Sequence, residues 1–261
     1  MSTITLNQRQ TVRTLRAAMH SEATKFCSLR PLVWLFLAGI AVSMVLAWLL
    51  GASAKASGEN GYDTAMAAPL MVFATLQFGQ LFFAAAAVLH LTGEYSADQI
   101  SRTLQAVPRR GLLLAAKLVV VAVMGFAGGV LSVVLGTIPA ALAAGDYGVF
   151  TGAQLASATL GAGVYLALLA VMSQGLGMVC RNSTGGIVAM LMLVIGLPQV
   201  LQLIRIQWVQ DVVAYLPTNA ATLMATGATE PYGTGVALAV LVGWAVVLGG
   251  AGALRMVRSD A

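Results

Sequence analysis

Long stretches of this chain carry no charged side chain, and they set the limits on its fold. The stretch 64–93 contains no Asp, Glu, Lys or Arg, and comparable apolar stretches recur along the sequence. Charged residues make up 9% of the chain and hydrophobic residues 59%, against about 25% and about 45–50% in soluble domains. Too few charges remain to cover a water-facing surface, so a soluble fold is excluded.

Each of these stretches is long enough for a membrane-spanning helix, which needs roughly 20 mostly apolar residues. The predicted fold is an all-α polytopic membrane protein, with one membrane domain over residues 1–261. The predicted spans are about 31–51, 67–91, 112–136, 154–180, 185–204 and 234–254. The uncharged run 212–229 is broken by Pro217 and several threonines. We therefore interpret 205–233 as an external or re-entrant segment, because protein or water must satisfy its backbone.

The basic residues predict the orientation of these spans. Six spans place both termini on one side, and every Lys and Arg except Lys55 and Arg205 falls on that side. Cytoplasmic loops are enriched in Lys and Arg, so we expect a cell-membrane protein with both termini in the cytoplasm. A seventh span at 212–229 would move Arg255 and Arg258 outside, which opposes it. Because the basic residues are divided among loops, nucleic-acid binding is not expected.

Residues 7–30 predict an amphipathic helix before span one. Val12, Leu15, Met19, Phe26 and Leu29 fall on one stripe of this helix. A second stripe carries the basic residues Arg9, Arg13 and Arg16. We interpret it as an elbow helix at the bilayer interface, with acyl chains against its apolar face and anionic headgroups against its basic face. Pro31 is expected to end this helix and start the span.

Lys117 is the charged residue inside a predicted span. It lies about 8 Å from the start of span three at about 1.5 Å per residue. A Lys in mid-bilayer is costly, but its flexible stem lets the ammonium group reach back to the interface. We expect Lys117 to be such a membrane-interface residue.

A charged segment, EYSADQISRTLQAVPRR at 94–110, interrupts the apolar chain between spans two and three. Ser96 and Gln99 have the spacing of a capping box, and Asp98 lies in the first turn, where the helix dipole favours negative charge. The pattern predicts a short cytoplasmic helix at 96–107, whose apolar edge is formed by Ile100, Leu104 and Val107. Either it is a connector lying on the membrane, or it is a coupling helix that docks on a soluble motor subunit.

The absence of a motor motif favours the second interpretation. The sequence has no G-x-x-x-x-G-K-[ST] loop and no H-E-x-x-H or C-x-x-C motif, so we expect no catalytic residue, metal site or cofactor on this chain. Ion-coupled transporters usually bury ionisable groups in their spans, whereas these spans contain no Asp or Glu. We therefore expect a non-enzymatic transport subunit driven by another chain. A self-contained secondary transporter or channel is the alternative.

Three segments resemble permeases of actinobacterial type-2 ATP-binding cassette (ABC) exporters. They are SEATKFCSLRPLVWL at 21–35, LTGEYSADQISRTLQAVPRRGLLLAAK at 91–117 and YLPTNAATL at 215–223. Two positions depart from the family pattern, since Ala23 stands where Trp is common and Cys27 where a basic residue is common.

The resemblance implies a permease that pairs with a second permease copy, identical or different, and with two ATP-binding subunits. ATP and Mg²⁺ would then be bound by the partner subunits. The resemblance also implies that the segment from Glu94 to Leu104 contacts the ATPase. The expected ATPase-coupling residues are Glu94, Tyr95, Ser96, Asp98, Ile100, Arg102 and Leu104.

One face of span two carries the predicted substrate path. Phe73, Gln77 and Gln80 are spaced by four and three residues. A Gln within a span either joins helices by hydrogen bonds or lines a pore, and we adopt pore lining as a hypothesis because the family places this helix near the permease interface. Ser173 and Gln174 are further candidates. Uncharged spans favour an amphipathic or hydrophobic substrate, such as a drug, antibiotic peptide or lipid, although sodium export is an alternative.

Two further features concern packing. Gly125 and Gly129 form a G-x-x-x-G pattern that favours close contact between helices. Pro198 is expected to kink span five near its outer end.

Overall fold

The computed structural model describes residues 2–96 and 110–258, with side chains from 14–93 and 111–256. Throughout these ranges the chain forms helices and no strands, which confirms the predicted all-α class. Six helical segments in the described ranges are long and apolar enough to cross a membrane. They are α2 (Arg30–Glu59), α3 (Ala68–Ser96), α5 (Arg110–Ala144), α6 (Gly152–Cys180), the α7–η2–α8 segment (Ser183–Gln202) and α11 (Thr234–Arg258).

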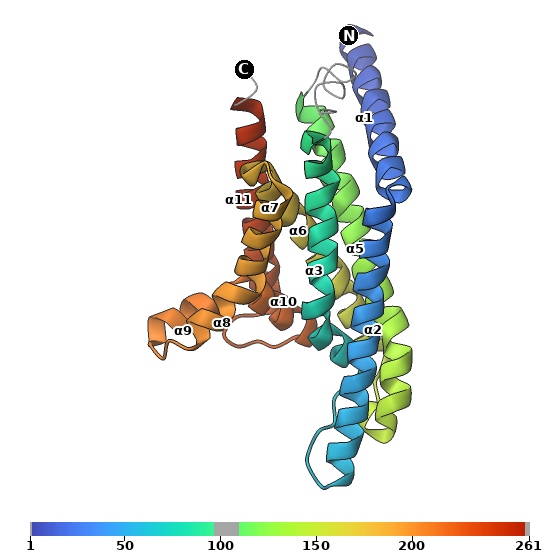
Figure 1. Cartoon of the computed structure of the whole chain (residues 1–261), viewed down its shortest axis with the longest axis vertical. Helices are drawn as coiled ribbons and strands as arrows, with labels where there is room; N and C mark the ends of the chain where they lie inside the picture. The colour runs from blue at the N-terminus through green and yellow to red at the C-terminus, as the bar shows by residue number, and fades with distance from the viewer. Residues whose placement is uncertain (1, 97–109, 259–261) are drawn as a thin grey trace.

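The long helices lie alongside one another along the long axis of the molecule (Figure 1). The N-terminus, the C-terminus, the end of α3 and the start of α5 all lie at the same end of the bundle. An even number of spans requires this arrangement of the termini. Because the charged segment 94–110 connects α3 to α5, both of its attachment points lie at the end of the bundle where the chain begins and finishes.

Helices α2 and α5 are longer than the sequence predicted. They contain 30 and 35 residues, which correspond to about 45 and about 52 Å at about 1.5 Å per residue. The hydrocarbon core of a bilayer is only about 30 Å thick. Both helices extend past α3 at the end of the bundle opposite the termini (Figure 1). There the short helix η1 (Gly145–Gly148) follows α5, and the carbonyl of its Tyr147 accepts a hydrogen bond from the amide of Met66 at 3.1 Å.

The predicted G-x-x-x-G contact is confirmed between α5 and α6. A Cβ atom added to Gly125 would overlap the carbonyl oxygen of Leu166, and one added to Gly129 would overlap that of Ala162. The two backbones therefore approach as closely as glycine permits. This contact holds α6 close against α5.

Helix α1 (Ser2–Ser28) precedes α2, and the chain leaves helical geometry at Leu29. Pro31 occupies the first turn of α2, so its expected role at this boundary is confirmed. Helix α1 does not lie crosswise to α2 as an elbow would. It continues along the bundle axis and packs against α5 (Figure 1). Its buried face contains Ala18, Glu22 and Phe26, so a carboxylate lies on the stripe that meets the protein.

The fifth span is not a single α-helix. Helix α7 (Ser183–Leu191) passes into the π-helical turn η2 (Met192–Gly196) and then into α8 (Leu197–Gln202), which contains Pro198. The π-helical turn thus lies directly before Pro198, the residue predicted to kink this span. Because Pro198 has no N–H, the carbonyl of Val194 lacks its α-helical donor. The hydroxyl of Thr218 donates to this carbonyl at 2.9 Å instead.

The segment predicted to be external or re-entrant, 205–233, contains the short helices α9 (Gln207–Ala214) and α10 (Pro217–Thr226). With 8 and 10 residues, neither is long enough to span a bilayer. Helix α9 projects sideways from the bundle (Figure 1). Helix α10 packs against α6, α11 and α3, and buries Ala220 and Ala221. It therefore completes one wall of the bundle.

Candidate functional site

A cleft of about 210 Å³ lies between α3, α6 and α10. Phe73, Gln77 and Gln80, the three residues predicted to form a substrate path, all line it from α3. The opposite walls contribute Tyr165 from α6 and Thr218, Thr222 and Thr226 from α10. Drug-sized binding sites usually measure about 300–1,000 Å³. In this conformation the cleft therefore accommodates a small molecule or one end of a larger one.

Gln80 connects the two long walls of the cleft. Its side chain is buried, and its Nε2 donates to the carbonyl of Gln77 at 2.9 Å. Its Oε1 accepts a hydrogen bond from the hydroxyl of Tyr165, which is itself buried. Gln80 thus forms the interhelical hydrogen bond that is one expected role of a Gln in a span. Gln77 is exposed on the same face, which leaves its amide available to a ligand.

The α10 wall presents hydrogen-bond acceptors. Thr218 donates its hydroxyl hydrogen to the carbonyl of Val194, Thr222 to that of Thr218 and Thr226 to that of Thr222. Each hydroxyl hydrogen is therefore already committed to a backbone carbonyl, and lone pairs of the oxygen remain. No Asp, Glu, Lys, Arg or His among the described residues lines the cleft. A ligand would meet an uncharged surface with an aromatic ring, an amide and hydroxyl oxygens.

Sequence patterns alone did not identify the α6 and α10 walls. Tyr165 lies in an apolar span where nothing local marks it as functional. The threonines at 218, 222 and 226 recur every four residues, which places them on one face of a helix. That spacing was a usable signal once α10 was known to be helical.

The further candidates Ser173 and Gln174 do not line this cleft. Ser173 is buried and donates to the carbonyl of Leu169 on its own helix at 2.7 Å. Gln174 places its Nε2 3.4 Å from Nδ1 of His90. Gln174 therefore belongs to a second polar region, nearer the end of the bundle where the termini lie.

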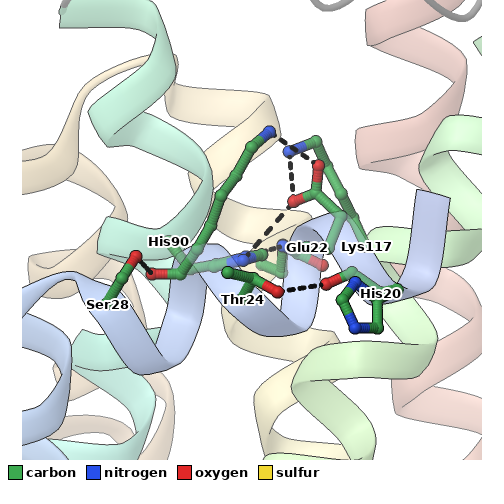
Figure 2. A network of polar contacts seen from close by, with 8 residues as sticks. His20, Glu22, Thr24, Ser28, His90 and Lys117 are labelled. Carbon is green, nitrogen blue, oxygen red and sulfur yellow. Dashed lines mark hydrogen bonds and ion pairs between the residues drawn. The ribbon is translucent and has the colours of Figure 1, made fainter. Parts of the chain in front are cut away.

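This second region is a buried charged cluster centred on Glu22 (Figure 2). The Glu22 carboxylate on α1 lies 2.8 Å from Nζ of Lys117 on α5, and the two side chains are 1% and 0% exposed. Nε2 of His90 on α3 lies 3.5 Å from the same oxygen, and Nζ of Lys25 lies 2.9 Å from the other. Glu22 thus joins three helices through one carboxylate.

The expected snorkelling of Lys117 is not what the structure shows. Its ammonium group is fully buried and forms an ion pair with Glu22 instead of reaching toward water. The physical reason is that α1 brings a carboxylate to the start of α5, which compensates the buried charge. The predicted spans contain no Asp or Glu of their own, but Glu22 from α1 supplies a carboxylate to two of them.

The environment of Glu22 favours its ionised form. Burial by itself raises the pKa of the carboxyl group, because a charge is harder to hold away from water. The charge and hydrogen bond of Lys117, followed by those of Lys25, act in the other direction and hold the pKa below its usual range. Glu22 is therefore a carboxylate at neutral pH. Its opposite charge is what makes a buried Lys117 tolerable in this fold.

The predicted coupling segment falls almost entirely outside the described residues. Helix α3 is described through Ser96, the residue predicted to cap the coupling helix. The side chains of Glu94, Tyr95 and Ser96 are outside the described range, as are residues 97–109, and the coupling helix stays a prediction. Of the predicted basic interface residues, Arg16 is exposed on α1, and the side chains of Arg9 and Arg13 lie outside the described range.

No protein-family model matches the chain, and no curated protein matches its sequence. The six apolar helices in the described ranges are consistent with a membrane transporter.

Proposed function

We propose that this chain is the permease subunit of an ATP-driven ABC exporter that moves an amphipathic or hydrophobic substrate outward. The observation that carries the proposal is the uncharged cleft between α3, α6 and α10, which gathers all three residues of the expected substrate path. Such a cleft within a bundle of apolar helices suits a neutral or amphipathic molecule that enters from the bilayer. The resemblance of segments 21–35, 91–117 and 215–223 to ABC permeases supports the same assignment.

The chain needs a partner to use ATP. Its sequence contains no phosphate-binding loop, so the proposal assigns ATP and Mg²⁺ to two separate ATPase subunits. The segment 94–110 is the proposed docking site, because it joins the ends of α3 and α5 and α3 forms one wall of the cleft. A second permease copy would complete the transporter in the bilayer, with the termini in the cytoplasm.

The docking step can be tested with paired substitutions in this segment. Ile100→Asp and Leu104→Asp place charges on the predicted apolar edge and should abolish co-purification with the proposed ATP-binding subunit. Gln105→Asp, on another face of the predicted helix, is the matched control and should leave binding intact. Binding of both edge variants at wild-type affinity would overturn the docking proposal.

Transport itself requires reconstitution. The chain and its ATPase, placed together in proteoliposomes, should export amphipathic dyes or antibiotic peptides only when ATP is hydrolysed. Sodium flux measured in the same vesicles tests the alternative that the substrate is Na⁺. If the chain alone moves a substrate down an ion gradient without ATP, the ABC assignment is wrong.

That last outcome defines a second candidate, an ion-coupled secondary transporter. The observation that favours it is the cluster of Glu22, His90 and Lys117, because buried ionisable groups in membrane proteins often mark ion or proton pathways. The cluster does not line the described cleft. The same proteoliposomes distinguish the candidates, since a secondary transporter responds to a pH or sodium gradient in the absence of the ATPase.

A further inference from the structure

Glu22 contacts both helices that flank the charged segment. His90 lies on α3, which enters the segment, and Lys117 lies on α5, which leaves it. Their nitrogens lie 3.5 and 2.8 Å from the same oxygen of Glu22 (Figure 2). The Glu22 carboxylate on α1 therefore links α3 and α5. Any force on residues 97–109 acts on these same two helices.

Breaking the contact between Glu22 and Lys117 is energetically costly. Lys117 is 0% exposed, so separating α1 from α5 would remove the Glu22 carboxylate from a buried ammonium group. Removing one partner of a buried ion pair is strongly destabilising, whereas replacing both by neutral groups is often tolerated. Apolar packing adds to the link, because the ring of Phe26 lies 5.6 Å from that of His90.

We propose that Glu22 is a positioning residue that fastens α1 to α3 and α5, so that the three helices move as one unit when the segment between α3 and α5 is displaced. The attachment of α1 is a property of this chain alone. The displacement rests on the proposed function, in which an ATPase pushes on that segment. The two parts are therefore tested separately.

The attachment is tested by cysteine accessibility in the purified full-length chain. In a background of Cys27→Ser and Cys180→Ser, the probe is Ala18→Cys, which is buried against the bundle, and the matched control is its exposed neighbour Ala17→Cys. A water-soluble maleimide should modify Ala18→Cys slowly in the presence of Glu22. Glu22→Gln should accelerate that modification by at least about ten-fold and leave Ala17→Cys unchanged.

A second variant separates charge pairing from packing. Glu22→Gln combined with Lys117→Met also removes the ammonium charge that Glu22 balances in the wild-type chain, so Ala18→Cys should regain most of its protection. If Glu22 only filled space, its substitution would have the same effect with or without the Lys117→Met change. Unchanged accessibility in Glu22→Gln, or equal exposure in the single and double variants, would overturn the attachment. Monodisperse elution of each variant confirms that it has folded.

The coupled movement is tested with the ATPase present. Glu22→Gln should retain ATP hydrolysis within about two-fold and lose at least about ten-fold in transport, because the drive no longer reaches α1. Parallel loss of hydrolysis and transport, or retention of both, would contradict the proposal that the three helices move as one unit. Failure of the ATPase to bind the wild-type chain at all would instead refute the proposed function, and the accessibility result would stand by itself.

Discussion

The hydroxyl of Tyr165 donates a hydrogen bond to the side-chain carbonyl of Gln80, and this bond joins α6 to α3 at the wall of the cleft. Both side chains are buried, so neither can exchange its partner for bulk water. The bond therefore sets the separation of two walls of the proposed substrate site. It also makes the cleft sensitive to the loss of a single oxygen atom.

The first prediction follows from that bond. Tyr165→Phe keeps the ring and removes the donor, leaving Oε1 of Gln80 buried without its partner. An unsatisfied buried polar group costs about 1–3 kcal/mol, so the variant should unfold at a lower temperature in detergent. Thermal unfolding followed by circular dichroism measures the difference. Adding Gln80→Leu should recover part of the loss, and an unchanged midpoint in Tyr165→Phe would contradict the role of the bond.

The second prediction concerns substrate recognition by Gln77. Its side chain is exposed and lines the cleft, so Gln77→Leu should alter transport without lowering stability. We expect about a two- to twelve-fold loss for substrates with a hydrogen-bonding group, since one such bond contributes about 0.5–1.5 kcal/mol. Phe78→Leu is the matched control, because Phe78 is exposed on α3 but does not line the cleft. Equal effects of the two substitutions on transport would remove Gln77 from the substrate path.

The third prediction concerns the contact between α5 and α6. Gly129→Ala places a methyl group against the carbonyl oxygen of Ala162, and overpacking of this kind costs about 1–3 kcal/mol. Gly250→Ala on α11 is the control, because no described atom lies within 4 Å of a Cβ added there. The control should be neutral or slightly stabilising, since Ala is favoured over Gly in helices. The unfolding midpoints of the two variants are compared. An unchanged midpoint in Gly129→Ala would refute the close approach of α5 and α6.

The spans were predictable because they depend on local composition. A run of apolar residues near 20 long identifies a span without any knowledge of its neighbours, and spacings of three and four place Phe73, Gln77 and Gln80 on one helix face. The lengths of α2 and α5 were underestimated for a related reason. Helical geometry continues beyond the most apolar residues, and hydropathy does not report where it stops.

The partners across the fold were not predictable in the same way. Glu22 and Lys117 are 95 positions apart, and no local period indicates that α1 brings one to the other. The sequence favoured a Lys117 side chain that reaches water, because a buried pair needs a tertiary contact that a single sequence does not reveal. Tyr165 was missed for the same reason, because its importance depends on facing Gln80.

The last prediction is a dependence on pH that arises from Glu22. The pKa of Glu22 is held below its usual range by Lys117 and Lys25 against the opposing effect of burial, so the folded state favours the carboxylate more than the unfolded state does. The stabilisation is therefore fully present above the unfolded pKa, about 4.3, and is lost as pH falls through the lower folded value. Among the described residues, the charged and titratable neighbours of Glu22 are Lys25 on α1, His90 on α3 and Lys117 on α5.

A spin label at Met19→Cys, which is half-buried on α1, reports whether that helix stays docked. With Cys27 and Cys180 replaced by Ser, the label should stay immobilised between about pH 7 and about pH 5. It should become mobile only as pH falls below the unfolded pKa and through the lower folded pKa of Glu22, where Glu22 binds a proton and Lys117 loses the negative charge of that carboxylate. In Glu22→Gln the label should already be mobile at about pH 7 and should show no such transition. A transition of the same size in Glu22→Gln would assign the acid sensitivity to another group.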